Sequence, residues 1–374
     1  KVNQLCPGEI IVFDKDLAIK NRSLSTIKDK NYVESLNLRD ELSSRFVSDV
    51  NAGVFLSGGL DSGLLLNLLS KYNKDQNIKR PLNAYTLKVL NSSSSEIDCE
   101  LSKKSANFSK CNHIILEIKP DQLKERSFNL NKKSSEPLLD PSAILLDLIS
   151  EKASKAIKVA ICGEAADEIF IGYRRQRLAF LIARLSSIYI FGKIFEKIIK
   201  NNKFLRSYIF SRLFYGVFNK FDFDQIESVP LSKLDLILTQ NDLYNSLPDG
   251  LLRRVDIVTL KNNIEARSPF CALLKYSNNI HKSTFKKFNI VSKPLLRKFI
   301  KKNNFLDLEV LNQKKRGFEL DLKQFISLNL KVITSTVRES TISSYCKTNL
   351  FNDFVKFKTK KDALKIWMIY QLAI

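Results

Sequence analysis

The sequence predicts an α/β protein in which a parallel, doubly wound sheet is followed by a largely helical C-terminal portion. From about residue 50, short β-branched runs alternate with helical runs, a pattern typical of βαβ units whose parallel sheet is covered on both faces. The strand pattern fades after Tyr173, and residues 176–300 have the period of amphipathic helices. Ligands bind such sheets beyond the carboxyl ends of the strands, so the loops at those ends are the candidate functional segments.

Each element is expected from its own residues. The expected strands of the sheet are 52–56, 84–90, 113–118 and 158–162, the last of which ends at Gly163. The expected helices between them are 62–71, 96–108 and 141–156. Pro141 fits the first turn of its helix, where a missing N–H group costs nothing. Residues 362–374 are expected to form another apolar helix, and residues 9–14 a strand after the Pro7-Gly8 turn.

Charge and cysteine usage restrict the class of protein. The formal net charge is +22, which would suit a nucleic acid or an anionic membrane, but the basic residues are spread along the whole chain. We therefore expect no nucleic-acid or membrane partner. The six scattered cysteines form no C-x-x-C pair, which favours a reducing, cytoplasmic setting. Charged residues interrupt the apolar stretch 178–199, which therefore predicts an amphipathic or buried helix and not a membrane span.

The segment Ser57-Gly58-Gly59-Leu60-Asp61-Ser62 follows an expected strand and opens an expected helix. Two glycines allow close approach of the backbone to a ligand, and the N–H groups of a helix start bind anions. Ser57 and Ser62 add hydroxyl donors, whereas Asp61 would repel phosphates unless Mg²⁺ lay between them. The loop therefore predicts a metal-bridged polyphosphate site, and its spacing excludes a Walker A loop.

Three carboxylates, Glu164, Asp167 and Glu168, follow the fourth expected strand. Asp167 is the natural second ligand for a Mg²⁺ ion held by Asp61. Glu168 has two open interpretations, a functional carboxylate or a charge that faces the dipole of a helix start.

The loop at 57–62 resembles the PP-loop of the ATP pyrophosphatases, which cleave ATP between the α and β phosphates. Further segments, in order along the chain, resemble the synthase domain of the asparagine synthetases. They are Glu136-Pro137, Asp140-Pro141-Ser142-Ala143, Cys162 to Tyr173, Leu247-Pro248-Asp249, Arg254-Val255-Asp256, Glu265 to Phe270, Lys293 to Arg297 and Lys314 to Phe318. The resemblance runs from about residue 5 to the C-terminus.

The resemblance implies roles for individual residues. Glu164 would act as a base when ammonia attacks an acyl-adenylate, and Lys314 would offset charge on the α-phosphate and the leaving pyrophosphate. Asp61 and Asp167 would complete the catalytic set as Mg²⁺ ligands. The residues expected to contact ATP are Leu56, Ser57, Gly58, Gly59, Asp61, Ser62, Leu87, Cys162 and Gly163. His113 is expected to have a structural role.

The expected reaction converts aspartate, ATP and ammonia to asparagine, AMP and pyrophosphate. A related ligase that amidates another carboxylate, in a surface-sugar or secondary-metabolite pathway, stays open. The β-lactam-forming branch carries Tyr at the position of Glu164, so this residue disfavours that branch. A tRNA-modifying protein would need an RNA-binding domain or a thiol pair, and neither is visible. A non-catalytic regulator conflicts with the presence of Asp61, Glu164, Asp167 and Lys314.

The start of the chain is expected to continue from a longer protein. Leu5-Cys6-Pro7-Gly8 resembles the turn near the end of a glutaminase domain, and residue 1 is Lys. We therefore expect residues 1–18 to be the end of such a domain or a linker, 19–175 to be the ATP-binding core and 176–374 to complete the synthase. The glutaminase would be an upstream domain or a separate subunit, and a homodimer is left open.

Overall fold

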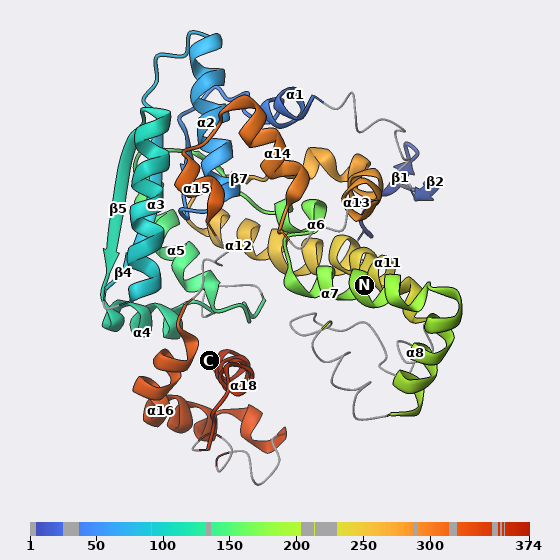
Figure 1. Cartoon of the computed structure of the whole chain (residues 1–374). Helices are drawn as coiled ribbons and strands as arrows, with labels where there is room; N and C mark the ends of the chain where they lie inside the picture. The colour runs from blue at the N-terminus through green and yellow to red at the C-terminus, as the bar shows by residue number, and fades with distance from the viewer. Residues whose placement is uncertain are drawn as a thin grey trace. The chain divides into compact units, whose positions relative to one another are not determined.

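The computed structural model describes residues 5–24, 37–90, 92–131, 136–202, 213, 230–286, 291–313, 320–345, 351, 354 and 356–374 (Figure 1). The chain forms two compact units that alternate along the sequence. The sheet unit comprises residues 45–163, 253–268 and 303–374, and the helix unit comprises residues 1–44, 164–252 and 269–302. The predicted division at residues 18 and 175 stays a prediction.

The sheet unit is built on five parallel strands in the order β5-β4-β3-β6-β7. Their bounds are β3 Ala52–Phe55, β4 Asn83–Val89, β5 Asn112–Ile118, β6 Val159–Ile161 and β7 Glu265–Arg267. Successive strands run outward from β3 to β5, and the chain then returns to place β6 on the other side of β3. The doubly wound parallel sheet is thus confirmed, with its topological switch point between β3 and β6.

Helices cover the sheet because each strand-to-strand connection is a crossover. The connecting helices are α2 Leu60–Asp75, α3 Ser93–Ser109, α4 Pro120–Asn129, α5 Ser142–Ala153 and α12 Arg253–Lys261. Figure 1 shows α3 running along β4 and β5, beside α2. The C-terminal part adds α15 Leu308–Asn312, α16 Leu322–Glu339, the 3₁₀ helix η4 Thr341–Tyr345 and α18 Lys360–Ala373.

The main core of the sheet unit joins α5, α12, α16 and α18 through buried aliphatic and aromatic side chains. Trp367 of α18 packs edge-on against Phe325 of α16, with ring centroids 5.8 Å apart. The Trp367 indole also donates a hydrogen bond to the Leu139 carbonyl at 3.0 Å, so its one polar atom is satisfied. The late helices therefore pack against the segment that leads into α5.

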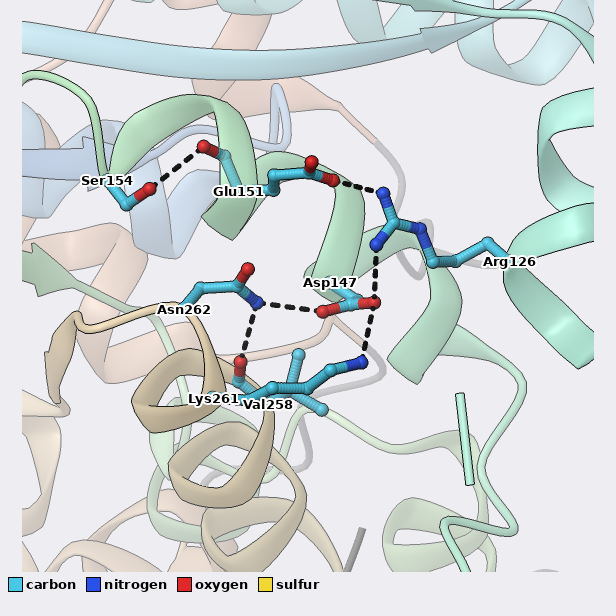
Figure 2. Close-up of polar contacts among 7 residues, drawn as sticks. All are labelled: Arg126, Asp147, Glu151, Ser154, Val258, Lys261 and Asn262. Atoms are coloured by element: carbon cyan, nitrogen blue, oxygen red, sulfur yellow. Dashed lines mark hydrogen bonds and ion pairs between the residues drawn. The ribbon is translucent and has the colours of Figure 1, made fainter. Parts of the chain in front are cut away.

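A buried carboxylate fixes α4 and α12 to α5 (Figure 2). Asp147 of α5 is 0% exposed and accepts hydrogen bonds from Arg126 at 3.1 Å, Lys261 at 3.2 Å and Asn262 at 2.7 Å. Arg126 also contacts Glu151. A buried charge is tolerated only when it is paired and hydrogen-bonded, and here three donors from two other segments meet that need.

The helix unit contains a hairpin and a set of helices. Its elements are β1 Glu9–Phe13, β2 Ile19–Leu24, α1 Leu38–Ser43, α6 Ala166–Phe170, α7 Arg174–Ser186, α8 Tyr189–Asn201, η1 Leu231–Lys233, α11 Leu234–Asn241, η2 Asp242–Leu252, η3 Pro269–Tyr276, α13 Ser277–Lys286 and α14 Pro294–Asn303. Of these, η1 and η3 are 3₁₀ helices and η2 is a π-helix with Pro248 inside it.

Two sequence expectations are corrected by the structure. Residues 176–300 were expected to be helical, yet β7 at Glu265–Arg267 is the fifth strand of the sheet. Its three residues are too few to show an alternating pattern, and backbone pairing with β6 alone defines it. The expected single helix at 178–199 is two helices, α7 and α8, separated at Ser187–Ile188. Among the described residues, no helix is long and apolar enough to cross a membrane.

Candidate active site

The loop Ser57–Ser62 connects β3 to α2 at the switch point of the sheet. Gly58 has φ +72°, and a Cβ there would lie 2.2 Å from the Asp98 carbonyl oxygen of α3. Only glycine therefore fits. Gly59 is the N-cap of α2, so the N–H groups of the first helical turn, which have no partner within the helix, lie at the loop. A helix start of this kind favours bound anions.

Hydrogen bonds within the loop hold its two serines together. The Ser57 N–H donates to the Ser62 hydroxyl at 3.2 Å, and the two hydroxyl oxygens are also 3.2 Å apart. The Gly59 N–H lies 3.4 Å from the Ser57 hydroxyl oxygen. The loop is therefore folded on itself, with hydroxyl and backbone donors gathered at the start of α2.

The end of β6 approaches the same loop. A Cβ on Gly163 would lie 3.3 Å from Cβ of Asp61 and 3.6 Å from the Ser62 nitrogen. The structure thus brings Gly163 together with Asp61 and Ser62, at the edge where the sequence predicts the nucleotide. Cys162 is buried, and its N–H donates to the Arg267 carbonyl of β7 at 2.8 Å.

Leu56 and Leu87 lie in the interior of the sheet unit, and their side chains are almost fully buried. The predicted contacts of these two residues with ATP stay predictions. Lys314 lies outside the described residues, as do residues 315–319. Its predicted role likewise stays a prediction.

The carboxylates that follow Gly163 lie in the helix unit, on and before the short helix α6. Left-handed residues bracket this helix: Ala165 has φ +73° at its start and Ile171 has φ +60° at its end. For a β-branched residue this conformation is a genuine outlier. Strained residues of this kind persist where surrounding contacts enforce them, and they cluster at functional sites.

Asp167 is held by a buried lysine. The Lys293 ammonium lies 2.9 Å from Oδ1 of Asp167, and Lys293 is only 4% exposed with φ +53°. Gly172 leaves room for this pair, because a Cβ there would lie 1.7 Å from Oδ1 of Asp167 and 2.6 Å from Cε of Lys293. The segment at Lys293 is part of the resemblance to the asparagine synthetases, but no local sequence pattern indicates that the Lys293 side chain reaches Asp167.

Glu168 is a buried carboxylate, 2% exposed. Burial, together with the neighbouring charge of Asp167, raises the pKa of Glu168 to about 7. The Tyr173 hydroxyl donates a hydrogen bond to it at 2.6 Å, and the His281 ring contacts its backbone carbonyl at 2.9 Å. Glu168 also lies in the first turn of α6, where a carboxylate faces the helix dipole, and its functional interpretation stays a prediction.

A second buried carboxylate in the helix unit also has cationic and amide partners. Asp242 at the start of η2 forms an ion pair with Arg175 at 2.6 Å and accepts a hydrogen bond from the Gln176 amide at 3.0 Å. Asp242 is among the groups whose charge raises the pKa of Glu168. Residues Asp167 to Gln176 thus carry a network of buried charges that sequence reasoning did not foresee.

Sequence comparison matches nearly the whole chain to one family. The model of the asparagine synthase family matches residues 36–372. Asparagine synthetase [glutamine-hydrolyzing] 1 of Bacillus subtilis is 24% identical and aligns with 97% of this chain, and the chain spans 62% of that relative's length. A putative asparagine synthetase [glutamine-hydrolyzing] of Mycobacterium tuberculosis is also 24% identical, over 62% of this chain and 39% of its own length.

Solved structures resemble the chain more distantly. NMN synthetase from Francisella tularensis has a TM-score of 0.28 and 14% identity, covering 62% of this chain and 95% of its own. A U34-tRNA thiolase from Methanococcus maripaludis has a TM-score of 0.28 and 16% identity, covering 65% and 78%. The family model, by contrast, spans both compact units, including the loop at 57–62 and the carboxylates at 164–168. The chain belongs to the asparagine synthase family.

Proposed function

We propose that the chain is the synthase part of an ATP-dependent, AMP-forming amide ligase that makes asparagine from aspartate and ammonia. The observation that carries the proposal is the Ser57–Ser62 loop, which offers hydroxyl and backbone donors at a helix start beside the switch point of a parallel sheet. Membership of the asparagine synthase family supports the reaction class.

Each part of the loop has a proposed task toward ATP. Ser57, Gly58, Gly59 and Ser62 bind the β and γ phosphates, which leave together as pyrophosphate. Leu56, Leu87, Cys162 and Gly163 border the adenosine. Gly163 lies directly against the loop, because a Cβ there would be only 3.3 Å from Cβ of Asp61.

The donor set of the loop fits Mg²⁺. This ion usually takes one or two protein carboxylates and completes its shell with phosphate oxygens and water. As the sequence and its resemblance imply, we assign Mg²⁺ to Asp61 and Asp167 together with the phosphates. When bound, Mg²⁺ would neutralise charge on the pyrophosphate leaving group.

The remaining steps are assigned to Glu164 and Lys314. Adenylation converts the aspartate β-carboxylate, a poor electrophile, into an acyl-adenylate whose AMP group leaves readily. Glu164 takes a proton from the attacking ammonia, and Lys314 stabilises negative charge on the α-phosphate. Glu164→Gln should therefore spare pyrophosphate exchange but slow asparagine formation. Equal loss of both activities would contradict the role of Glu164 as a base.

We also propose that a glutaminase domain or subunit supplies the ammonia, in the cytoplasm. The relatives are named as glutamine-hydrolysing and are longer than this chain. The β1–β2 hairpin supports a partner of some kind, because Ile10, Val12, Phe13 and Ile19 are exposed on it. An isolated two-stranded hairpin is only marginally stable in water, so a covering surface would stabilise it.

A second candidate function is amidation of a carboxylate other than aspartate. It is favoured by Cys271-Ala272-Leu273 on η3, which stands where the family pattern has Leu-Asp-His. Pyrophosphate exchange with a panel of amino acids and other carboxylates separates the two candidates. Exchange that depends on aspartate supports the first, and exchange with another acid alone supports the second.

Carboxylate variants test the proposed metal ligands. Asp61→Asn and Asp167→Asn should each abolish AMP formation and weaken Mg²⁺-dependent pyrophosphate binding. The unfolding midpoint of Asp61→Asn should stay near that of the wild type, whereas that of Asp167→Asn should fall because the buried Lys293 loses its ion pair. Asp16→Asn is the matched control, because Asp16 lies exposed in the β1–β2 turn. Normal turnover by either site variant would exclude that residue as a ligand.

A further inference from the structure

Polar side chains from β4 and β5 hold the start of the Ser57–Ser62 loop from behind. The Thr86 hydroxyl of β4 donates a hydrogen bond to the Leu56 carbonyl at 2.8 Å. The His113 ring of β5 reaches the same hydroxyl, with Nε2 at 2.9 Å. A series of hydrogen-bonded groups thus runs across three adjacent strands of the sheet, from His113 through Thr86 to the Leu56 carbonyl at the start of the loop.

Counting the available hydrogens identifies the donor and the acceptor of each of these hydrogen bonds. A threonine hydroxyl has one hydrogen, and Thr86 uses it toward the Leu56 carbonyl. The Thr86 oxygen must then accept a hydrogen bond from His113, which places the proton of the neutral ring on Nε2. The Ser102 hydroxyl of α3, 3.4 Å from that nitrogen, donates to the Cys99 carbonyl at 2.7 Å and so can only accept from His113.

Burial encloses Thr86 and disfavours a charge on the His113 ring. Thr86 is 1% exposed and lies within the sheet. Desolvation, followed by the nearby charge of Lys103, lowers the pKa of His113. Either charge state of the ring keeps a hydrogen on Nε2, so the bond to Thr86 does not depend on protonation.

The two ends of a single peptide group are fixed in this way. The carbonyl of the Leu56–Ser57 peptide is held by Thr86, and its N–H is held by the Ser62 hydroxyl at 3.2 Å. Since a peptide group is planar, two hydrogen bonds at opposite edges set its orientation. That orientation in turn fixes the position of the Ser57 Cα, from which the hydroxyl-bearing side chain extends.

We propose that Thr86, supported by His113, is a positioning residue for nucleotide binding: it holds the Leu56–Ser57 peptide in the orientation that the polyphosphate of ATP requires. The inference rests on the proposed function, because it assumes that this loop binds ATP. It adds two residues, on β4 and β5, that would act through the loop and not by touching the nucleotide.

The test uses variants that differ in one hydrogen bond. Thr86→Val has nearly the same shape as Thr86 and lacks the hydroxyl, whereas Thr86→Ser keeps it. His113→Phe removes the donor to Thr86, and His113→Gln retains a donor at about the same reach. Thr259→Val is the matched control, because Thr259 is also buried and donates to a backbone carbonyl, that of Val255 at 2.8 Å, within α12.

Calorimetry with Mg²⁺ and α,β-methylene-ATP, which cannot be cleaved between the α and β phosphates, measures the affinity of the loop for nucleotide without turnover. Thr86→Val should weaken binding about tenfold, the loss expected when one hydrogen bond that holds a group in place is removed. His113→Phe should give a smaller loss in the same direction. Thr86→Ser, His113→Gln and Thr259→Val should bind within a factor of about three of the wild type. In turnover, Thr86→Val should raise KM for ATP and leave kcat and KM for the carboxylate nearly unchanged.

Distinct outcomes separate this inference from the proposed function. If the wild-type chain does not bind the nucleotide analogue, the proposed function fails and this inference fails with it. If the wild type binds and Thr86→Val binds equally well, only the inference is overturned. An equal loss in Thr86→Val and Thr259→Val, or no rescue by Thr86→Ser, would also overturn it, since a general loss of stability would then explain the effect. If Thr86→Val does not fold, the His113 pair decides: binding by His113→Phe equal to that of His113→Gln refutes the inference.

Discussion

Replacing Gly172 by alanine should disable the site while leaving the fold intact. The new Cβ would lie 1.7 Å from Oδ1 of Asp167 and 2.6 Å from Cε of Lys293. Carbon and oxygen atoms need about 3.2 Å, so the carboxylate must move by roughly 1.5 Å. The atoms that must move are the ends of two side chains, and their 2.9 Å ion pair is the contact that is lost.

The size of the effect follows from that displacement. Overpacking of a well-packed site costs about 1–3 kcal/mol of unfolding free energy. A misplacement of about 1 Å in a catalytic site lowers turnover about 10²-fold. We therefore expect a loss of about 1–3 kcal/mol in the free energy of unfolding, which lowers the urea midpoint without preventing folding, and a loss of AMP formation of at least about 10²-fold.

Gly250→Ala is the matched control for this prediction. Gly250 lies in η2 of the same unit, and a Cβ there would meet nothing within 4 Å. The control should keep both stability and turnover. Wild-type turnover in Gly172→Ala, or an equal loss of turnover in Gly250→Ala, would refute the reasoning that the bare Gly172 backbone makes room for Asp167 and Lys293.

Two further predictions concern stability. Asp147→Ala should lower the free energy of unfolding by about 3 kcal/mol, because it leaves the partly buried Arg126 and Lys261 without their shared carboxylate. Glu151→Ala is the control, since it removes only an exposed partner of Arg126, and it should cost less than about 1 kcal/mol. Urea unfolding of both variants checks this, and equal losses would contradict it. His281 should make stability depend on pH, because burial lowers its pKa from 6.5 to about 4. The unfolded chain binds the proton first, so stability is fully present above about pH 6.5 and decreases as pH falls toward 4, by up to about 3 kcal/mol. His281→Gln should reduce this slope in unfolding curves between pH 4 and 7, and an unchanged slope would exclude His281 as its source.

The sheet and the loop at 57–62 were predictable because their signals are local. Four of the strands are apolar runs bounded by turns. The two glycines and two serines of the loop indicate a helix start that binds anions. The strand β7 was not predictable, since its three residues become a strand only by pairing with β6. The break between α7 and α8 was missed because an amphipathic period continues across it.

Contacts between distant residues were beyond sequence reasoning. Lys293 lies far along the chain from Asp167, and only the folded backbone, with left-handed residues at 165, 171 and 293, brings the two together. The role of Thr86 was equally hidden, because a threonine in a strand is ordinary and its bond to Leu56 depends on the register of β3 and β4. Sequence patterns report local preferences, whereas these contacts arise from packing across elements.

The measurement that tests the central claim most directly is the identity of the nucleotide product. The purified chain is incubated with ATP, Mg²⁺, aspartate and ammonium, and the nucleotides are separated and quantified together with pyrophosphate. The loop at 57–62 is proposed to bind the β and γ phosphates as one leaving group, so the account predicts AMP and pyrophosphate in equal amounts. Formation of ADP and inorganic phosphate in their place would contradict it.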